Sequence, residues 1–239
     1  MILCIDCGNT RIKWGLLTPK GLWQAHGVMP LAQLDNLRAA LIDQPAFKRV
    51  VACNVSGAEN GERIAAQIKV TPEWVVPQRE QCGVKNGYKK AAQLGADRWA
   101  SLIAARAMHS GACLVVNAGT ATTIDLLGAD GRFRGGVILP GLNLMRKALA
   151  HNTADLPLAD AAHQAIPTDT DSAIVSGALE ASAGAIERMF ARLEDPTATC
   201  LLSGGAAAAI APLLQIPVQS IDDLVLRGLA CIALSDNRS

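Results

Sequence analysis

The sequence predicts an α/β fold of two similar lobes, each a mixed sheet flanked by helices, with a ligand cleft between them. A strand, an Asp or Asn, a Gly and a hydroxyl-rich turn into a second strand occur at 2–15 and again at 114–125. In each half, three strands precede alternating helices and strands, and 239 residues suffice for two domains. We therefore expect an N-terminal lobe, 1–111, and a C-terminal lobe, 112–239.

The N-terminal lobe is expected to contain five strands and three helices. Short apolar runs predict strands over 2–7, 11–17, 22–28, 49–55 and 73–76, and longer periodic segments predict helices over 31–43, 57–68 and 97–109. Prolines lie near the ends of these elements, where proline is tolerated. The last helix has an apolar face at helical spacing, formed by Trp99, Leu102, Ile103 and Ala107.

The C-terminal lobe repeats the order of the first. Its predicted strands cover 112–117, 121–127, 132–139, 198–203 and 216–218, and its predicted helices cover 142–150, 172–193, 205–211 and 221–234. An irregular segment is expected over 151–169. The long helix has an apolar stripe that would pack on a sheet.

Composition narrows the class of protein. The net charge is +1 with no basic run, which argues against nucleic acid as a partner. No apolar run approaches the length of a membrane span, and no secretory signal precedes the first strand. The seven cysteines are scattered, as expected of reduced thiols. We therefore expect a cytoplasmic protein, with Cys4-x-x-Cys7 structural because no second pair could complete a zinc site.

Two turns are candidate phosphate sites. Asp6 ends a buried strand beside Gly8, where a carboxylate can hold hydrated Mg²⁺ next to phosphate oxygens, or can simply cap its own turn. Asn9, Thr10 and Lys13 follow and favour the binding interpretation.

The second turn is Gly119-Thr120, where Thr120 could donate its hydroxyl and its backbone N–H to a phosphate. The alternative is an ordinary β-hairpin turn. The echo of the first turn favours phosphate binding.

The start of the predicted helix 97–109 is a candidate catalytic element. Asp97 near the N-cap could accept the proton of an attacking hydroxyl, as in many kinases, and Arg98 could pair with the carboxylate of a small acid. On residue types alone, a helix cap and a surface arginine are the commoner explanation. There is no P-loop, no GxGxxG opening a helix, no GxSxG and no metal-spaced pair of histidines.

Five motifs, in this order, resemble those of type III pantothenate kinases, members of the acetate and sugar kinase, Hsp70 and actin superfamily. They are Asp6-x-Gly8-Asn9-Thr10-x-x-Lys13, Gly95-x-Asp97-Arg98, Gly119-Thr120-Ala121, Gly136-x-Ile138-x-Pro140-Gly141 and Ser203-Gly204-Gly205. The resemblance extends from residue 2 to about 230. The first motif marks only the superfamily, but its combination with Gly-x-Asp-Arg in so short a chain is specific to the family.

The resemblance implies actin-like (ribonuclease H-like) lobes and ATP-dependent phosphorylation of pantothenate to 4′-phosphopantothenate, the first step of coenzyme A synthesis, by a homodimer with its substrate pocket near the subunit interface. It implies Asp97 as general base and Asp6 as the residue that engages Mg²⁺. It implies nucleotide contacts from Asp6, Cys7, Gly8, Asn9, Thr10, Arg11, Ile12, Lys13 and Thr120. It implies pantothenate contacts from Tyr88, Gly95, Ala96, Asp97, Arg98 and Thr170.

One position departs from the family. Many members have an aspartate where this chain has Asn117, and that side chain helps to bind a monovalent cation such as K⁺ or NH₄⁺. A neutral amide attracts a cation less strongly, so we expect weak dependence on K⁺ or none.

Two other functions stay open on the sequence. A phosphatase of the same superfamily would share the first turn but would use water as the acceptor. A non-catalytic ATP-binding regulatory protein would need no base at position 97.

Overall fold

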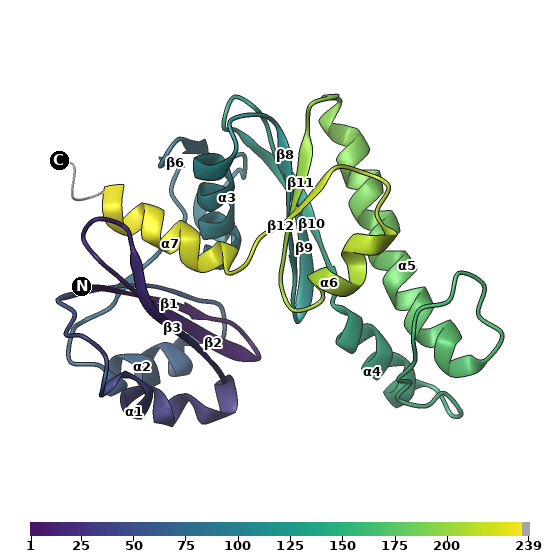
Figure 1. Cartoon of the computed structure of the whole chain (residues 1–239), viewed down its shortest axis with the longest axis horizontal. Helices are drawn as coiled ribbons and strands as arrows, with labels where there is room; N and C mark the ends of the chain where they lie inside the picture. Colours follow the sequence, from purple (N-terminus) through teal and green to yellow (C-terminus); the bar gives the residue numbers. More distant parts are fainter. Residues whose placement is uncertain (236–239) are drawn as a thin grey trace. The chain divides into compact units, whose positions relative to one another are not determined.

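The computed structural model describes residues 1–235, which form two compact units (Figure 1). The first unit comprises Met1–Ser110, Gly131–Phe133 and the described residues from Asp223 to Ser235, and the second comprises Gly111–Asp130 and Arg134–Asp222. Two segments from the second half of the chain are therefore integral to the first unit.

The first unit is built on a five-stranded mixed sheet of order β3-β2-β1-β4-β5. Its strands are β1 (Ile2–Cys7), β2 (Arg11–Leu17), β3 (Trp23–Pro30), β4 (Arg49–Asn54) and β5 (Glu73–Trp74). The first three strands are antiparallel neighbours, and β4 runs parallel to both β1 and β5. The antiparallel half carries tight turns, and the parallel half needs crossovers through helices.

Helices cover this sheet on both faces, as Figure 1 shows. The helices of the unit are η1 (Leu31–Asn36), α1 (Leu37–Leu41), α2 (Ala58–Gln67), η2 (Ala91–Gln93), α3 (Ala96–Met108) and α7 (Leu224–Ser235). Alternate residues of β1, Leu3, Ile5 and Cys7, pack in a core with residues of η1, α1 and α2. The other face is covered by α7 and α3, which contact β1 and β4.

The packing of α7 on α3 depends on a glycine. A Cβ at Gly228 would overlap the carbonyl group of Ala100 and would lie 2.8 Å from the Cα of Ala100. Gly228 therefore lets the two helix backbones approach more closely than any side chain would allow.

A small hairpin lies outside the main sheet of the first unit. It pairs β6 (Glu80–Gln81) with β7 (Val84–Lys85). The segment 131–133 joins this hairpin, because the Lys85 N–H donates to the Gly131 carbonyl at 2.9 Å. Gly131 has φ +75°, and a Cβ there would overlap the Gly83 carbonyl oxygen, so the contact requires glycine.

The second unit repeats the sheet of the first, with the order β10-β9-β8-β11-β12. Its elements are β8 (Cys113–Ala118), β9 (Ala121–Leu127), β10 (Phe133–Pro140), α4 (Leu142–Asn152), α5 (Thr170–Phe190), η3 (Ala191–Leu193), β11 (Thr199–Ser203), α6 (Ala207–Ile210), η4 (Ala211–Leu213) and β12 (Val218–Ser220). As in the first unit, the middle strand has one antiparallel and one parallel neighbour. The apolar stripe of α5 packs on β8 and β9.

Three of the differences from the predicted elements have a local cause. The predicted helix 31–43 is two short pieces, η1 and α1, because Gln33 is non-helical and no side chain caps the helix start. The stretch between β5 and α3 contains β6 and β7, which are too short for a periodic signal. Helix α5 begins at Thr170 rather than 172, because Asp169 caps it by accepting from the Ser172 N–H at 2.9 Å.

Within residues 1–235, none of the helices is both long and apolar enough to cross a membrane.

Candidate functional site

Three side chains of the first unit form a row across the middle of its sheet. Asp6 of β1 pairs in register with Lys13 of β2 on one side and with Cys53 of β4 on the other. Side chains of directly paired residues lie on the same face of a sheet. The Cys53 thiol donates to Asp6 Oδ1 at 3.4 Å, which fixes the carboxylate at the carboxyl end of β1.

The environment of Asp6 favours an incoming cation. Burial raises the pKa of the Asp6 carboxyl from 3.8 to about 6, and the charges of Asp97 and Asp223 act in the same direction. The Cys53 hydrogen bond and the charge of Lys13 lower this pKa and offset burial only in part. A desolvated carboxylate that also feels two further negative charges gains more from a bound cation than a well-solvated one would.

The donor set suits Mg²⁺ that arrives with phosphates better than a metal held by protein alone. Among the described residues no cluster of three or more His, Cys, Asp or Glu side chains could hold a metal ion. Mg²⁺ usually keeps several waters and binds one or two carboxylates together with substrate phosphates. A single carboxylate at Asp6, next to a glycine turn, fits that pattern.

Lys13 forms an ion pair with Asp223, with 2.8 Å between Nζ and Oδ1. Asp223 lies immediately before α7 and has the unusual φ of +53°. The pair ties the second strand to the start of the last helix within the first unit.

The glycine turn between β1 and β2 is closed by backbone hydrogen bonds. The Gly8 N–H donates to the Arg11 carbonyl at 3.1 Å, while the side chains of Asn9 and Thr10 are exposed. The side chains of Cys7 and Ile12 lie in the core of the unit. Any nucleotide contact at those two positions would therefore come from the main chain.

Asp97 occupies the first turn of α3, two residues after the N-cap Gly95. Its Oδ1 accepts from the Arg98 N–H at 2.8 Å, and a Cβ at Gly95 would lie only 2.6 Å from this oxygen. Burial raises the pKa of Asp97, although the hydrogen bond and the charge of Arg98 oppose it. A carboxylate with a raised pKa is a stronger base, as a general base for a hydroxyl requires. The charge of Asp97 raises the pKa of Asp6, so the two carboxylates lie near enough to interact.

Arg98 is not the surface residue that its residue type suggests, since it is only 4% exposed. Its Nη1 donates to the Tyr88 hydroxyl at 3.0 Å. Its guanidinium lies 5.7 Å from the Tyr88 ring and 5.8 Å from the Phe133 ring. A buried guanidinium held by two aromatic rings is suited to receive an anionic group.

The second unit contains a glycine turn at the corresponding place, between β8 and β9, which is one residue shorter than the turn between β1 and β2. The Gly119 N–H donates to the Ala121 carbonyl at 3.1 Å, and Gly119 and Thr120 are exposed. Asn117 has the place in β8 that Asp6 has in β1, and it pairs in register with Thr123 and Ser203. The start of α4 packs against this turn through the Gly141 N–H, which donates to the Thr120 carbonyl at 3.0 Å.

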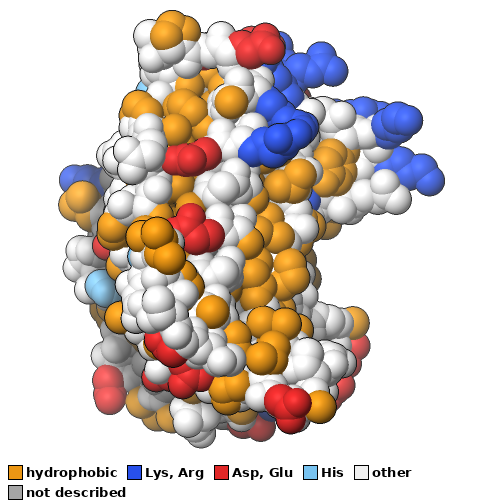
Figure 2. Space-filling view, turned by 90° about the vertical axis from the view of Figure 1, so that its right-hand side faces the viewer, with side chains coloured by type: hydrophobic (Ala, Val, Ile, Leu, Met, Phe, Trp, Pro, Cys, Tyr) orange, Lys and Arg blue, Asp and Glu red, His pale blue; other side chains and the backbone are white. Residues whose placement is uncertain are grey.

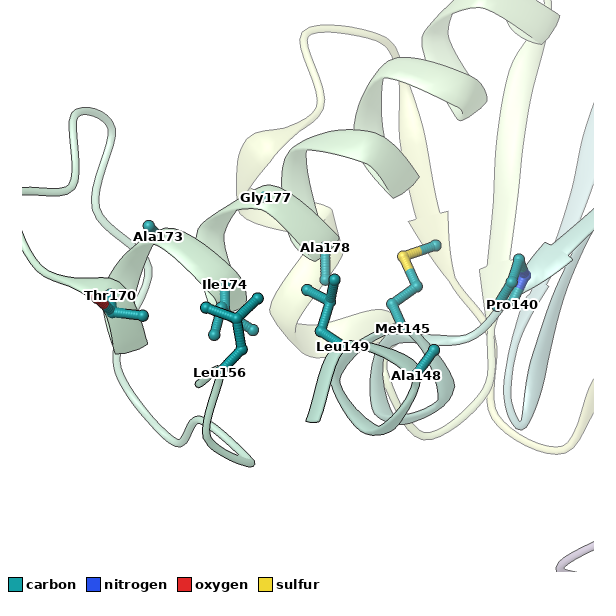
Figure 3. A pocket seen from close by; sticks show the side chains of 10 residues that line it. All are labelled: Pro140, Met145, Ala148, Leu149, Leu156, Thr170, Ala173, Ile174, Gly177 and Ala178. Carbon is teal, nitrogen blue, oxygen red and sulfur yellow. The ribbon is translucent and has the colours of Figure 1, made fainter. Parts of the chain in front are cut away.

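Thr170 lies in the second unit at the first residue of α5, beside an apolar cavity of about 660 Å³. Figure 3 shows Leu149, Leu156 and Ile174 converging there from α4, the following loop and α5. The lining residues are Pro140, Met145, Ala148, Leu149, Leu156, Thr170, Ala173, Ile174, Gly177 and Ala178. Figure 2, which views the side on which α5 lies, shows hydrophobic side chains gathered in a band.

The structure thus brings Asp6, Lys13, Tyr88, Asp97 and Arg98 into the first unit and places Asn117, Thr120 and Thr170 in the second. Sequence reasoning missed three further residues of the first unit that interact with this group: Cys53, Phe133 and Asp223. Cys53 could have been found from the sequence, because a strand that runs parallel to β1 must place one of its side chains beside Asp6. Phe133 and Asp223 had none, since each reaches the first unit from a distant part of the chain.

Comparison with known proteins identifies the family of the chain. A profile of the type III pantothenate kinase family matches residues 2–192. The type III pantothenate kinase of Aromatoleum aromaticum is 52% identical over 240 residues, with 99% of each chain covered. That of Azoarcus sp. is 48% identical over 241 residues, covering 99% of this chain and 92% of the relative.

Solved structures agree on the fold. A Campylobacter jejuni protein assigned to the Baf family of transcriptional activators superposes with a TM-score of 0.63 at 20% identity, covering 99% of this chain and 100% of its own. The ethanolamine utilization protein EutJ of Carboxydothermus hydrogenoformans gives a TM-score of 0.60 at 16% identity, covering 97% and 88%. The fold is α/β with two similar actin-like lobes, each a mixed sheet flanked by helices. On the match of the family profile and the identity to full-length relatives, the chain belongs to the type III pantothenate kinase family.

Proposed function

We propose that this protein transfers the terminal phosphoryl group of ATP to the hydroxyl of pantothenate, giving 4′-phosphopantothenate for coenzyme A synthesis. The observation that carries the proposal is the placement of a partly exposed base next to a buried cation at the start of α3. Asp97 has a raised pKa, and the guanidinium of the next residue, Arg98, lies beside the packed rings of Tyr88 and Phe133. Phosphoryl transfer to an alcohol needs a base for the hydroxyl proton and a means of orienting the acceptor.

The first unit supplies most of the proposed machinery. Asp97 takes the proton from the acceptor hydroxyl as the oxygen attacks the terminal phosphorus, and the bond from that phosphorus to the bridging oxygen of the β-phosphate breaks, which releases ADP. The backbone N–H groups of the exposed turn residues Asn9 and Thr10, with the Lys13 ammonium, bind the phosphates, and Thr120 of the second unit contributes a second phosphate turn. Asp6 would hold Mg²⁺, which when bound neutralises charge on the phosphate oxygens.

The acceptor site is proposed to consist of Tyr88, the Gly95–Ala96 turn, Arg98 and Thr170. Pantothenate carries a carboxylate at one end and the reactive hydroxyl toward the other. A guanidinium binds a carboxylate through two parallel hydrogen bonds, so Arg98 would hold the acid end. This would direct the hydroxyl toward Asp97, the residue before Arg98.

We expect a weak requirement for K⁺ or NH₄⁺. Asn117 offers an amide oxygen where a carboxylate would bind a monovalent cation more strongly. ATP turnover should therefore persist when K⁺ is replaced by a large organic cation.

We also propose that the protein acts as a cytoplasmic homodimer, and that the partner covers the apolar face of α4 and α5. The cavity beside Thr170 and the exposed Leu144, Leu149, Leu158 and Ile166 support this. Leu149→Arg should shift the protein to monomer in sedimentation equilibrium. Leu22→Arg, at a 62% exposed leucine of the first unit, is the matched control and should not. A wild-type monomer at micromolar concentration would rule out the dimer.

The activity is tested by measuring ADP release from ATP and Mg²⁺ with and without pantothenate, together with the mass of the product. The proposal expects pantothenate-dependent ADP and a product heavier by one phosphoryl group. ADP without pantothenate would favour a superfamily phosphatase, and nucleotide binding without turnover would favour a regulatory protein. Asp97→Asn should lower turnover by roughly 100-fold or more while the far-ultraviolet spectrum is unchanged.

A further inference from the structure

Phe133 is buried completely and lies in the first unit, although the strand that it begins, β10, belongs to the second. The three-residue segment 131–133 carries it there. No sequence motif singled it out, and it has been described above only as a neighbour of Arg98.

Phe133 is in contact with both aromatic and cationic parts of the proposed acceptor site. Its ring centroid lies 5.3 Å from that of Tyr88, with the planes inclined by 35°. The Arg98 guanidinium carbon lies 5.8 Å from the Phe133 centroid and 5.7 Å from the Tyr88 centroid. The Arg98 Nη1 also donates to the Tyr88 hydroxyl at 3.0 Å. These three side chains therefore form one packed group.

The backbone holds each aromatic residue in place. On one side, the Lys85 N–H donates to the Gly131 carbonyl, and Lys85 forms a parallel bridge with Arg132. On the other side, the Tyr88 N–H donates to Asn86 Oδ1 at 3.0 Å, and Asn86 Nδ2 donates to the Ala91 carbonyl at 3.3 Å. Phe133 thus presents a fixed ring to the other two side chains.

A fixed ring has a physical consequence for a buried arginine. The negative face of an aromatic ring attracts a guanidinium, and the attraction grows when water is excluded. A long arginine side chain has many rotamers, and a ligand that must order them binds less tightly. Packing against Phe133 removes that freedom before the ligand arrives.

We infer that Phe133 is a positioning residue for the acceptor site, which holds Tyr88 and the Arg98 guanidinium in the orientation that receives the carboxylate of the acceptor. Phe133 acts through these two side chains and does not touch the substrate. The inference rests on the proposed function, in which Arg98 binds the acid end of pantothenate. It adds that the affinity for the acid end depends on a residue outside the binding motifs.

The test compares Phe133→Leu with Phe47→Leu, a matched change at a partly buried phenylalanine packed against the core of the same unit. For Phe133→Leu we expect the KM for pantothenate to rise about tenfold, while kcat and the KM for ATP change less than twofold. Phe133→Tyr keeps the ring and should restore the KM for pantothenate to within about threefold of wild type. Phe47→Leu should leave the KM for pantothenate unchanged.

A second measurement reads the carboxylate directly. Wild type should prefer pantothenate to the analogue in which the carboxylate is reduced to an alcohol, and Phe133→Leu should lose most of that preference. A general packing defect would lower activity toward both compounds equally. If Phe133→Leu does not fold, the same ratio is measured on Phe133→Met, which fills more of the ring's volume.

An unchanged KM and an unchanged acid-to-alcohol ratio in a folded variant would overturn the inference, and so would equal losses in the Leu and Tyr variants. Failure of the proposed function would look different, because the wild-type protein would then not phosphorylate pantothenate at all.

Discussion

Gly228 in α7 offers the sharpest test of the packing in the first unit. Replacing it with Ala adds one methyl group, which would overlap the Ala100 carbonyl and lie 2.8 Å from the Ala100 Cα. The obstacle is helix backbone, so the two helices must separate. Inserting a methyl group into a packed core costs about 1–3 kcal/mol. The upper end of this range applies to Gly228→Ala, because the clashing atoms are backbone and no side chain can relieve the clash by changing rotamer.

The helix propensity of alanine opposes this cost. Gly to Ala in a helix interior gains about 1 kcal/mol, so Gly228→Ala should lose about 2 kcal/mol net. Gly184→Ala in α5 is the matched control, since Gly184 is exposed and a Cβ there meets nothing within 4 Å. That variant should gain about 1 kcal/mol. The two variants should therefore differ by about 3 kcal/mol in the free energy of unfolding.

Thermal unfolding followed by circular dichroism measures this difference. For a chain of this length, 1 kcal/mol corresponds to roughly 2–4 °C in Tm, so the variants should be separated by about 6–12 °C. A Gly228→Ala protein as stable as Gly184→Ala would refute the close approach of α7 to α3.

Three further predictions concern the candidate site. Burial raises the pKa of Asp6 from 3.8 to about 6, so the folded state holds this proton more tightly than the unfolded state, and stability is lost as pH rises from about 4 to 6. Asp6→Asn should therefore have a Tm above that of wild type at pH 7.5 and close to it at pH 4, and equal Tm values at both pH values would contradict the burial. Cys53→Val removes the donor to Asp6 and should raise the half-saturating Mg²⁺ concentration about fivefold, whereas Cys53→Ser keeps a donor and should not; identical Mg²⁺ titrations would show that the thiol does not orient the carboxylate. Asn117→Asp should make turnover depend on K⁺, whereas wild-type turnover should not. If the variant turned over faster than wild type in potassium-free buffer, our view of Asn117 would be disproved.

Elements with strong local patterns could be predicted from the sequence. The strands 2–7 and 11–17 agree with β1 and β2, since short apolar strands around a glycine turn leave few alternatives. The predicted helix 97–109 is within one residue of α3. Predictions failed where the structure depends on tertiary contacts. The helix 31–43 is split because nothing local caps it, and β6 and β7 pair over only two residues each.

The candidate site follows the same division. Asp6 and Asp97 could be found because each stands at a recognisable boundary of a strand or helix. The burial of Arg98 could not, because its neighbours come from Tyr88 on one loop and Phe133 on a segment that follows the second unit's first two strands. Contacts between residues so far apart in the chain leave no periodic trace in either segment.

The membership of α7 in the first unit has a consequence for how the protein is made. Ribosomes add roughly 5–20 residues per second, and the whole of the second unit is synthesised between α3 and α7. Until α7 leaves the ribosome, it cannot cover the faces of β1 and β4 against which it packs in the folded protein. The unit that is begun first is therefore completed last, and during synthesis the nascent chain exposes a sheet face that a chaperone can bind.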